Sequence, residues 1–301
     1  MNIYFRVPFK YKWDTFSNVR SLFEELQRLG HNVTLSDKSV EPFSPSVETD
    51  LIMLHGTAAT IPQYIFDKRI IPIISFGWSD PNLYAPYFAK TCDVYFTNDL
   101  SLSQRLSKAL NCFYLQTACN KKYHRYLGLA KETDILVYGV GVHPVVKDRN
   151  QTVDWLRSMG FTIKVFGRNW NPHKDTHPFI EGEELIVEIN KAHLCLDLSN
   201  SYTAFPHRIL ECSACGTPVL TFRREDTLSL LENEREIFTY ASKEELPYIL
   251  NAILKNGQFL KDVGANAQRR CYKDHNITNR VQELKEKLYS VGINLSVGES
   301  K

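Results

Sequence analysis

Short apolar runs alternate with amphipathic segments along the first half of the chain. Apolar residues recur at helical spacing from Trp13 to Leu29, and Gly30 marks the end of this helix. The apolar runs predict buried strands at residues 2–7, 32–36, 50–55, 70–77, 93–97 and 112–115. Strands that alternate with helices pair in parallel, so this half of the chain predicts an α/β domain built on a parallel sheet.

The same alternation resumes after a polar stretch at residues 120–132. Further apolar runs predict strands at residues 133–138, 194–199 and 217–222. A helix between the last two strands begins near Pro206 and ends at Gly216. Amphipathic helical patterns then occupy residues 243–255, 259–272 and 278–288. A second α/β domain is therefore expected in this half.

Length and composition agree with two soluble domains. A chain of 301 residues suggests domains of about 150 residues each, and 43% hydrophobic residues suffice for two cores. The net charge of +2 gives no broad surface for a polyanion, so nucleic acid is not an expected partner. No apolar run is long enough for a transmembrane helix, and the first residues lack the layout of a signal peptide.

Cysteine usage favours a cytoplasmic protein. The seven cysteines are odd in number and mostly lie inside apolar stretches, which is typical of reduced thiols. Cys212 and Cys215 form a C-x-x-C pair that admits zinc binding or redox chemistry. No second Cys or His pair stands at zinc spacing, so a packing role within the helix is favoured.

The most informative chemistry lies in the helix that follows the run at residues 194–199. Arg208 falls in its first turn, where the helix dipole disfavours a cation by roughly 0.3–1 kcal/mol. An anion bound there would reverse the effect, whereas a surface ion pair with Glu211 is the plain alternative. Glu211 lies one turn on and could accept hydrogen bonds from sugar hydroxyls. Binding groups for a phosphate and for sugar hydroxyls together indicate a nucleotide site. In the absence of bound nucleotide, the stability of the protein should not depend on Arg208.

At these residues the sequence resembles the GT-B glycosyltransferases, and most closely the CgeB-like (spore maturation protein) branch of the family-four-related group. The segments that carry the resemblance are Arg208-x-x-Glu211, residues 214–218, Glu236 before residues 238–240, residues 138–141, 149–156 and 165–170, and residues 275–280. Together they extend over residues 133–285, about half of the chain. They are specific as a set, although no single one would be.

The resemblance implies a fold and an activity. Two Rossmann-like domains are expected, an acceptor-side domain at residues 1–130 and a nucleotide-sugar-binding domain at 131–276, with a cleft between them. Residues 277–301 would form a C-terminal helix that crosses back to the first domain. The enzyme would be a hexosyltransferase that moves a sugar from a nucleoside-diphosphate sugar to an acceptor hydroxyl, with no cofactor besides this donor substrate.

Several residues of the second domain are candidates for binding the donor. The diphosphate would meet the amides around His207 and Arg208, and Glu211 would hold the ribose. Gly141 ends a strand and allows a close approach of the backbone, although a Gly-x-Gly pair alone is a weak signal. Arg149 and Arg168 stand at a helix start and a strand end where a diphosphate needs positive charge, with surface solvation as the alternative.

The first domain offers candidate catalytic residues at two strand ends. His55 could bond a substrate hydroxyl or the donor phosphate, or be satisfied by nearby backbone. Asp80 could accept the proton of the acceptor hydroxyl, but an Asp before Pro81 is also a standard helix start. Cap chemistry explains the Asp80–Pro81 pair well, so both interpretations stay open.

The family's paired-glutamate pattern has its first glutamate eight positions before the second, where this chain has Thr203. Tyr202 and Thr203 must therefore handle the donor sugar differently. The resemblance implies retention of anomeric configuration, and the lack of an Asp-x-Asp triplet at a strand end favours a metal-independent reaction. Two alternatives stay open: an inactive nucleotide- or glycan-binding protein of this fold, and a GT-B nucleotide-sugar epimerase.

Overall fold

The computed structural model describes residues 1–7, 18–37, 42–55, 71–77, 92–142, 148–199 and 205–295. These residues form two compact units, one of residues 1–117 with 277–301 and one of residues 118–276. The units divide earlier than the boundary expected after residue 130. Within the described residues, no helix is both long and apolar enough to cross a membrane.

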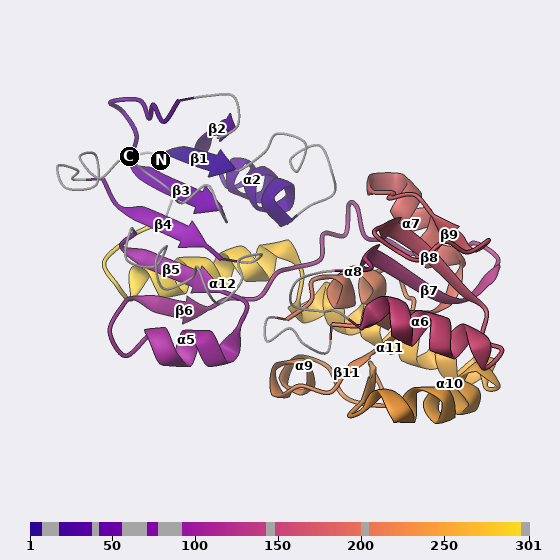
Figure 1. The fold of residues 1–301 in the computed structure, drawn as a ribbon. Coiled ribbons are helices and arrows are strands. Elements are labelled where there is room, and N and C mark those ends of the chain that lie inside the picture. Colours follow the sequence, from indigo (N-terminus) through magenta and orange to yellow (C-terminus); the bar gives the residue numbers. More distant parts are fainter. Residues whose placement is uncertain are drawn as a thin grey trace. The chain divides into compact units, whose positions relative to one another are not determined.

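The first unit contains a parallel sheet in the order β2-β1-β3-β4-β5-β6 (Figure 1). Its elements are β1 (Asn2–Val7), α2 (Asn18–Arg28), β2 (Asn32–Asp37), β3 (Leu51–His55), β4 (Ile73–Phe76), β5 (Val94–Thr97), α5 (Leu100–Leu106), β6 (Cys112–Tyr114) and α12 (Ile277–Tyr289). The central strands are buried along their whole length, as strands covered on both faces are. The C-terminal helix α12, drawn in yellow, packs against α2.

The second unit contains another parallel sheet, in the order β12-β11-β10-β7-β8-β9. Its elements are β7 (Thr133–Val140), α6 (Arg149–Ser158), β8 (Ile163–Arg168), β9 (Thr176–His177), α7 (Gly182–Lys191), β10 (Ala192–Asp197), α8 (Arg208–Ala214), β11 (Val219–Phe222), α9 (Glu225–Leu230), β12 (Phe238–Tyr240), the 3₁₀ turn η2 (Lys243–Glu245), α10 (Leu246–Leu254) and α11 (Gly257–Asp274). The two sheets are the Rossmann-like α/β arrangement that was expected.

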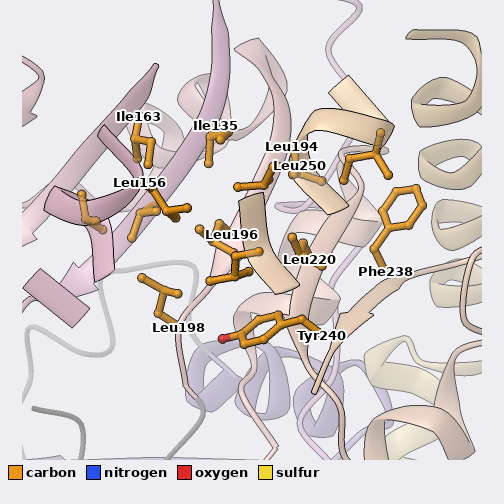
Figure 2. Packing of buried hydrophobic residues seen from close by; sticks show 14 of the residues in the cluster. Ile135, Leu156, Ile163, Leu194, Leu196, Leu198, Leu220, Phe238, Tyr240 and Leu250 are labelled. Carbon is orange, nitrogen blue, oxygen red and sulfur yellow. The ribbon is translucent and has the colours of Figure 1, made fainter. Parts of the chain in front are cut away.

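One face of the second sheet holds the main hydrophobic core (Figure 2). Leu194, Leu196 and Leu198 point from β10 and its end into a cluster with residues of α6, α10 and α11. Side chains alternate along a strand, so Cys195 and Asp197 lie on the opposite face. There they meet α8, whose Arg208 contacts Asp197. The helix that carries the candidate site thus covers the face opposite this core.

The ends of α8 are set by local sequence. Cys215 is the C-cap, and Gly216 follows with φ of +75°, a conformation that glycine adopts without strain. The amide of Thr217 donates to the carbonyl of Cys212 (3.1 Å), which closes the last turn. The expected helix end at Gly216 is therefore confirmed, and the chain enters β11 directly afterwards.

Candidate functional site

Three polar side chains lie beside one another at the carboxyl ends of the central strands of the second sheet. Asp197 pairs with Thr221 of β11, and the register Cys195↔Leu136 puts Asp197 beside Tyr138 of β7. The carboxyl ends of parallel strands are where α/β sheets bind ligands. All three therefore occupy the region in which a donor site is expected.

Asp197 is the centre of a buried polar network, since only 1% of the residue is exposed. The hydroxyls of Ser199 and Thr221 donate to its two carboxylate oxygens at 2.7 and 2.8 Å. Arg208 Nη1 lies 3.2 Å from Oδ1, and Arg224 Nη2 lies 3.9 Å from Oδ2. Burial raises the pKa of Asp197, but these two cations and the hydroxyls outweigh it and hold the pKa below its ordinary value.

The ion pair with Asp197 corrects what we expected of Arg208. Arg208 is the first residue of α8, with 16% of its side chain exposed, and it already has an anionic partner before any ligand binds. The expectation that stability does not depend on Arg208 assumed that no such partner exists, so we now expect Arg208 to contribute to stability. The plain alternative, in which it pairs with Glu211, is replaced by an ion pair between α8 and Asp197 at the end of β10.

The guanidinium of Arg208 is confined on its other sides. Its Cζ lies 5.4 Å from the centre of the Tyr138 ring. Gly139 has a φ of +123°, and a Cβ there would come within 3.2 Å of Arg208 Nη2. Arg208 Nε is buried and has no hydrogen-bond partner among the described residues. The described residues therefore leave this Nε–H donor unused.

Glu211 lies on the same helix, with 12% of its side chain exposed. The Tyr138 hydroxyl donates to Glu211 Oε2 at 3.1 Å. His124 Nε2 lies 4.0 Å from Oε1, and His124 Nδ1 accepts a hydrogen bond from the Asn120 amide at 3.0 Å. The carboxylate is thus oriented by side chains from β7 and from the segment that precedes it.

Arg149 is built into the fold rather than solvated. Only 5% of it is exposed, which rules out the surface alternative. Its Nε and Nη1 donate to the carbonyls of Leu198 (3.0 Å) and Val140 (2.9 Å), and Nη2 donates to the Ser199 hydroxyl (3.1 Å). Because Ser199 in turn donates to Asp197, Arg149 supports the network at the end of β10.

Two further candidates lie next to each other at the ends of β7 and β8. The Gly141 amide donates to the Arg168 carbonyl at 2.9 Å. A Cβ on Gly141 would come within 2.5 Å of the Asn169 carbonyl oxygen, so the glycine permits this close packing. The exposed guanidinium of Arg168 lies 5.0 Å from the centre of the Phe179 ring.

The remaining candidates are placed as follows. His207 is exposed and is the N-cap of α8, where its side chain makes no capping hydrogen bond. His55 ends β3 in the first unit and is 5% exposed. Asp80, Tyr202 and Thr203 lie outside the described residues.

None of the seven cysteines forms a disulfide. Cys212 and Cys215 are fully buried, as the packing interpretation of the C-x-x-C pair requires. Among the described residues, no group of three or more His, Cys, Asp or Glu side chains could hold a metal ion.

Sequence reasoning missed three residues of this site, Tyr138, Asp197 and Arg224. Asp197 was visible as the one charged residue in the apolar run at 194–199, a signal of a buried charge that must find partners. Tyr138 was noted only as part of the family resemblance. Arg224 also lies 3.7 Å from Asp226, two residues on, but nothing near it in the sequence indicates its contact with Asp197 on β10.

We compared the sequence with protein families and with curated proteins. Residues 149–286 match the model of a protein family described as glycosyl transferase-like. A sequence search of curated proteins found no match.

Solved structures resemble the whole chain. A sucrose-phosphate synthase from Thermosynechococcus elongatus has a TM-score of 0.75 and 13% identity, over 97% of this chain and 100% of its own. HepE of Anabaena in complex with UDP-glucose has a TM-score of 0.73 and 12% identity, over 96% and 100%. AviGT4, a glycosyltransferase involved in avilamycin A biosynthesis, has a TM-score of 0.69 and 13% identity, over 96% and 97%. The chain therefore has the fold of the GT-B glycosyltransferases, and its residues 149–286 match the glycosyl transferase-like family.

Proposed function

We propose that this chain is a hexosyltransferase of the CgeB-like branch that moves a sugar from a nucleoside-diphosphate sugar to an acceptor hydroxyl. The family match over residues 149–286 supports this proposal, as does the fold it shares with HepE, whose structure holds UDP-glucose. We infer a retaining, metal-independent reaction in the cytoplasm. The acceptor is a hydroxyl on a glycan, a small molecule or a protein.

The observation that carries the proposal is that α8 presents a cation, Arg208, and a carboxylate, Glu211, at the strand ends. Arg208 has a buried Nε–H that no described residue accepts, and an unsatisfied buried donor costs about 1–3 kcal/mol. A phosphate oxygen would satisfy it. Glu211, one turn on, is held as an acceptor for hydroxyls. A nucleoside diphosphate presents both phosphate oxygens and ribose hydroxyls.

Each residue then has a proposed role. Arg208 binds the diphosphate with help from His207 and Arg168, while Arg149 supports it through Ser199 and Asp197. Glu211 holds the ribose, and Gly141 keeps the ends of β7 and β8 close together. Tyr202 and Thr203 contact the donor sugar, and His55 and Asp80 supply the acceptor-side chemistry.

A thermal-shift screen of nucleoside diphosphates tests the proposal. A ligand at 100 times its Kd should add about 2.7 kcal/mol to the free energy of unfolding. UDP, GDP and ADP are compared, and the sugar conjugates of the tightest binder are then assayed for slow hydrolysis. Binding without any turnover would favour the inactive binding protein, and no binding at all would sink the proposal.

Replacing Glu211 by alanine should weaken nucleoside-diphosphate binding while the fold stays intact. The lost charge-assisted hydrogen bonds to the ribose correspond to roughly 1.5–3 kcal/mol of binding free energy. Calorimetric titration of the parent and the variant measures this directly. Glu225→Ala is the matched control, because Glu225 is an exposed carboxylate in the first turn of α9. Equal affinities in the parent and in Glu211→Ala would remove the ribose role.

Chelator should leave the activity nearly unchanged. The diphosphate is expected to be held by arginine and main-chain amides, which stabilise the developing charge of the leaving group without a metal. Turnover is measured with and without EDTA in the same preparation. Complete loss with EDTA that magnesium or manganese restores would reveal a carboxylate site outside this scheme.

A further inference from the structure

Tyr138 contacts both Glu211 and Arg208, the two side chains that bind the nucleotide in the proposed function. It lies near the carboxyl end of β7, next to Gly139, and reaches α8 from the sheet. Its hydroxyl is 3.1 Å from Glu211 Oε2, and its ring centre is 5.4 Å from Arg208 Cζ. One residue therefore joins the ribose-binding group to the phosphate-binding group.

The hydroxyl of Tyr138 is a permanent donor. Burial raises its pKa well above the ordinary value, and the neighbouring Cys212 and Glu211 raise the pKa further. The phenol therefore stays protonated across the physiological range and can always donate to the carboxylate. Cys212 Sγ, 3.4 Å from the same oxygen, is a weaker partner than an ionised carboxylate.

This hydrogen bond leaves Glu211 able to bind a ligand. A carboxylate offers about four lone-pair positions, and Tyr138 occupies one of them. His124 stands on the side of the other oxygen, at 4.0 Å. With one oxygen held by this hydrogen bond and His124 beside the other, the carboxylate is confined before a ligand arrives. Such preorganisation lowers the cost of binding.

The aromatic ring of Tyr138 acts on the guanidinium of Arg208. A guanidinium over an aromatic face is attracted by the ring's negative face, and this holds whether or not the ring carries a hydroxyl. Removing only the hydroxyl therefore changes the surroundings of Glu211 and leaves those of Arg208 in place. Removing the ring changes both.

We propose that Tyr138 is a positioning residue for the nucleotide, which orients Glu211 toward the ribose through its hydroxyl and Arg208 toward the diphosphate through its ring. The inference rests on the proposed function, because it assumes that these two side chains bind a nucleoside diphosphate. It predicts that the two effects can be separated by the choice of substitution and of ligand.

The test compares Tyr138→Phe and Tyr138→Leu with the parent in calorimetric titrations of the full chain. The ligands are the tightest of UDP, GDP and ADP, its 2′,3′-dideoxy form, and inorganic pyrophosphate. Tyr4→Phe is the control, since it also removes a buried tyrosine hydroxyl, one that donates to the Ser36 hydroxyl at 2.8 Å within the first unit. Melting temperatures show that each variant is folded.

Tyr138→Phe should raise the Kd for the ribonucleotide about tenfold, the effect of losing about 1.4 kcal/mol, and leave those for the dideoxy form and pyrophosphate within about twofold. Tyr138→Leu should in addition raise the Kd for pyrophosphate by roughly two- to fivefold. A merely structural tyrosine would weaken all three ligands alike. An unchanged ratio of ribo- to dideoxynucleotide affinity in Tyr138→Phe would overturn the inference.

The outcome separates this inference from the proposed function. If Glu211→Ala abolishes the preference for the ribonucleotide and Tyr138→Phe does not alter it, the function stands and the inference fails. If none of the three nucleoside diphosphates binds the parent, the proposed function fails and the inference fails with it.

Discussion

Replacing Asp197 by asparagine is expected to destabilise the protein by about 3–5 kcal/mol, the range found when one partner of a buried ion pair is removed. The substitution keeps the size of the side chain but leaves Arg208 and Arg224 facing a neutral group at a site where the carboxylate is 1% exposed. Calorimetric unfolding of the full chain measures the loss. It should appear as a drop of roughly 2–4 °C in Tm for each kcal/mol.

Asp134→Asn is the matched control for this change. Asp134 is an exposed carboxylate on the neighbouring strand β7, so its loss should alter stability by less than about 0.5 kcal/mol. Equal Tm values for the Asp197 variant and the Asp134 variant would mean that the buried network does not hold the strand ends together.

The effect of Asp197 should also depend on pH. Its pKa in the folded state is lowered, so its carboxylate stabilises the fold at pH above the unfolded value, for which the ordinary value is 3.8. This stability is lost as the pH falls through the folded pKa, because the carboxyl is then protonated in both states. The difference in free energy of unfolding between parent and Asp197→Asn should therefore be full at neutral pH and shrink below about pH 4.

Much of the fold could be predicted from the sequence because parallel strands are apolar along their length. The runs at residues 50–55 and 93–97 became β3 and β5 almost unchanged. Two predicted strands began too early, and both times a proline explains the difference. The β4 strand starts after Pro72 and β11 after Pro218, whose carbonyls accept hydrogen bonds from neighbouring strands although proline cannot donate to a ladder.

The site could be predicted only in part. The motif Arg208-x-x-Glu211 located the helix and the strand ends correctly, because helical spacing is a local property. The partner of Arg208 could not be found in this way. Asp197 belongs to β10, and the two side chains meet only when β10 and α8 pack together. The surface alternative is wrong for Arg149 for the same reason, since only 5% of this residue is exposed. Its partners are carbonyls at the ends of β7 and β10, which no local pattern encodes.

The position of Gly139 shows how local and tertiary constraints coincide. Its φ of +123° suits glycine, and the space where a Cβ would stand is bordered by Arg208 Nη2. The glycine pair was predicted to allow a close backbone approach at the strand end. What approaches Gly139 in the structure is the guanidinium, held between the ring of Tyr138 and the carboxylate of Asp197.

Arg208→Ala is expected to have two effects, one of which the sequence did not suggest. Without ligand, the free energy of unfolding should fall by about 3 kcal/mol, because among the described residues Asp197 then keeps only Arg224, 3.9 Å away, as a cationic partner. In addition, the stabilisation of about 2.7 kcal/mol that a nucleoside diphosphate gives at 100 times its Kd should disappear. Thermal unfolding with and without the diphosphate measures both effects in one series.

Arg224→Ala separates the two effects, since Arg224 also faces Asp197 while Arg208 alone contacts Tyr138 beside Glu211. Both variants should lose stability without ligand, because each takes one cation from the same buried carboxylate. Only Arg208→Ala should lose the response to the diphosphate. If both variants lose it equally, binding depends on the intact Asp197 network and Arg208 makes no direct contact with phosphate. If Arg208→Ala still responds like the parent, the buried Nε–H serves no ligand and the role of Arg208 is to neutralise Asp197.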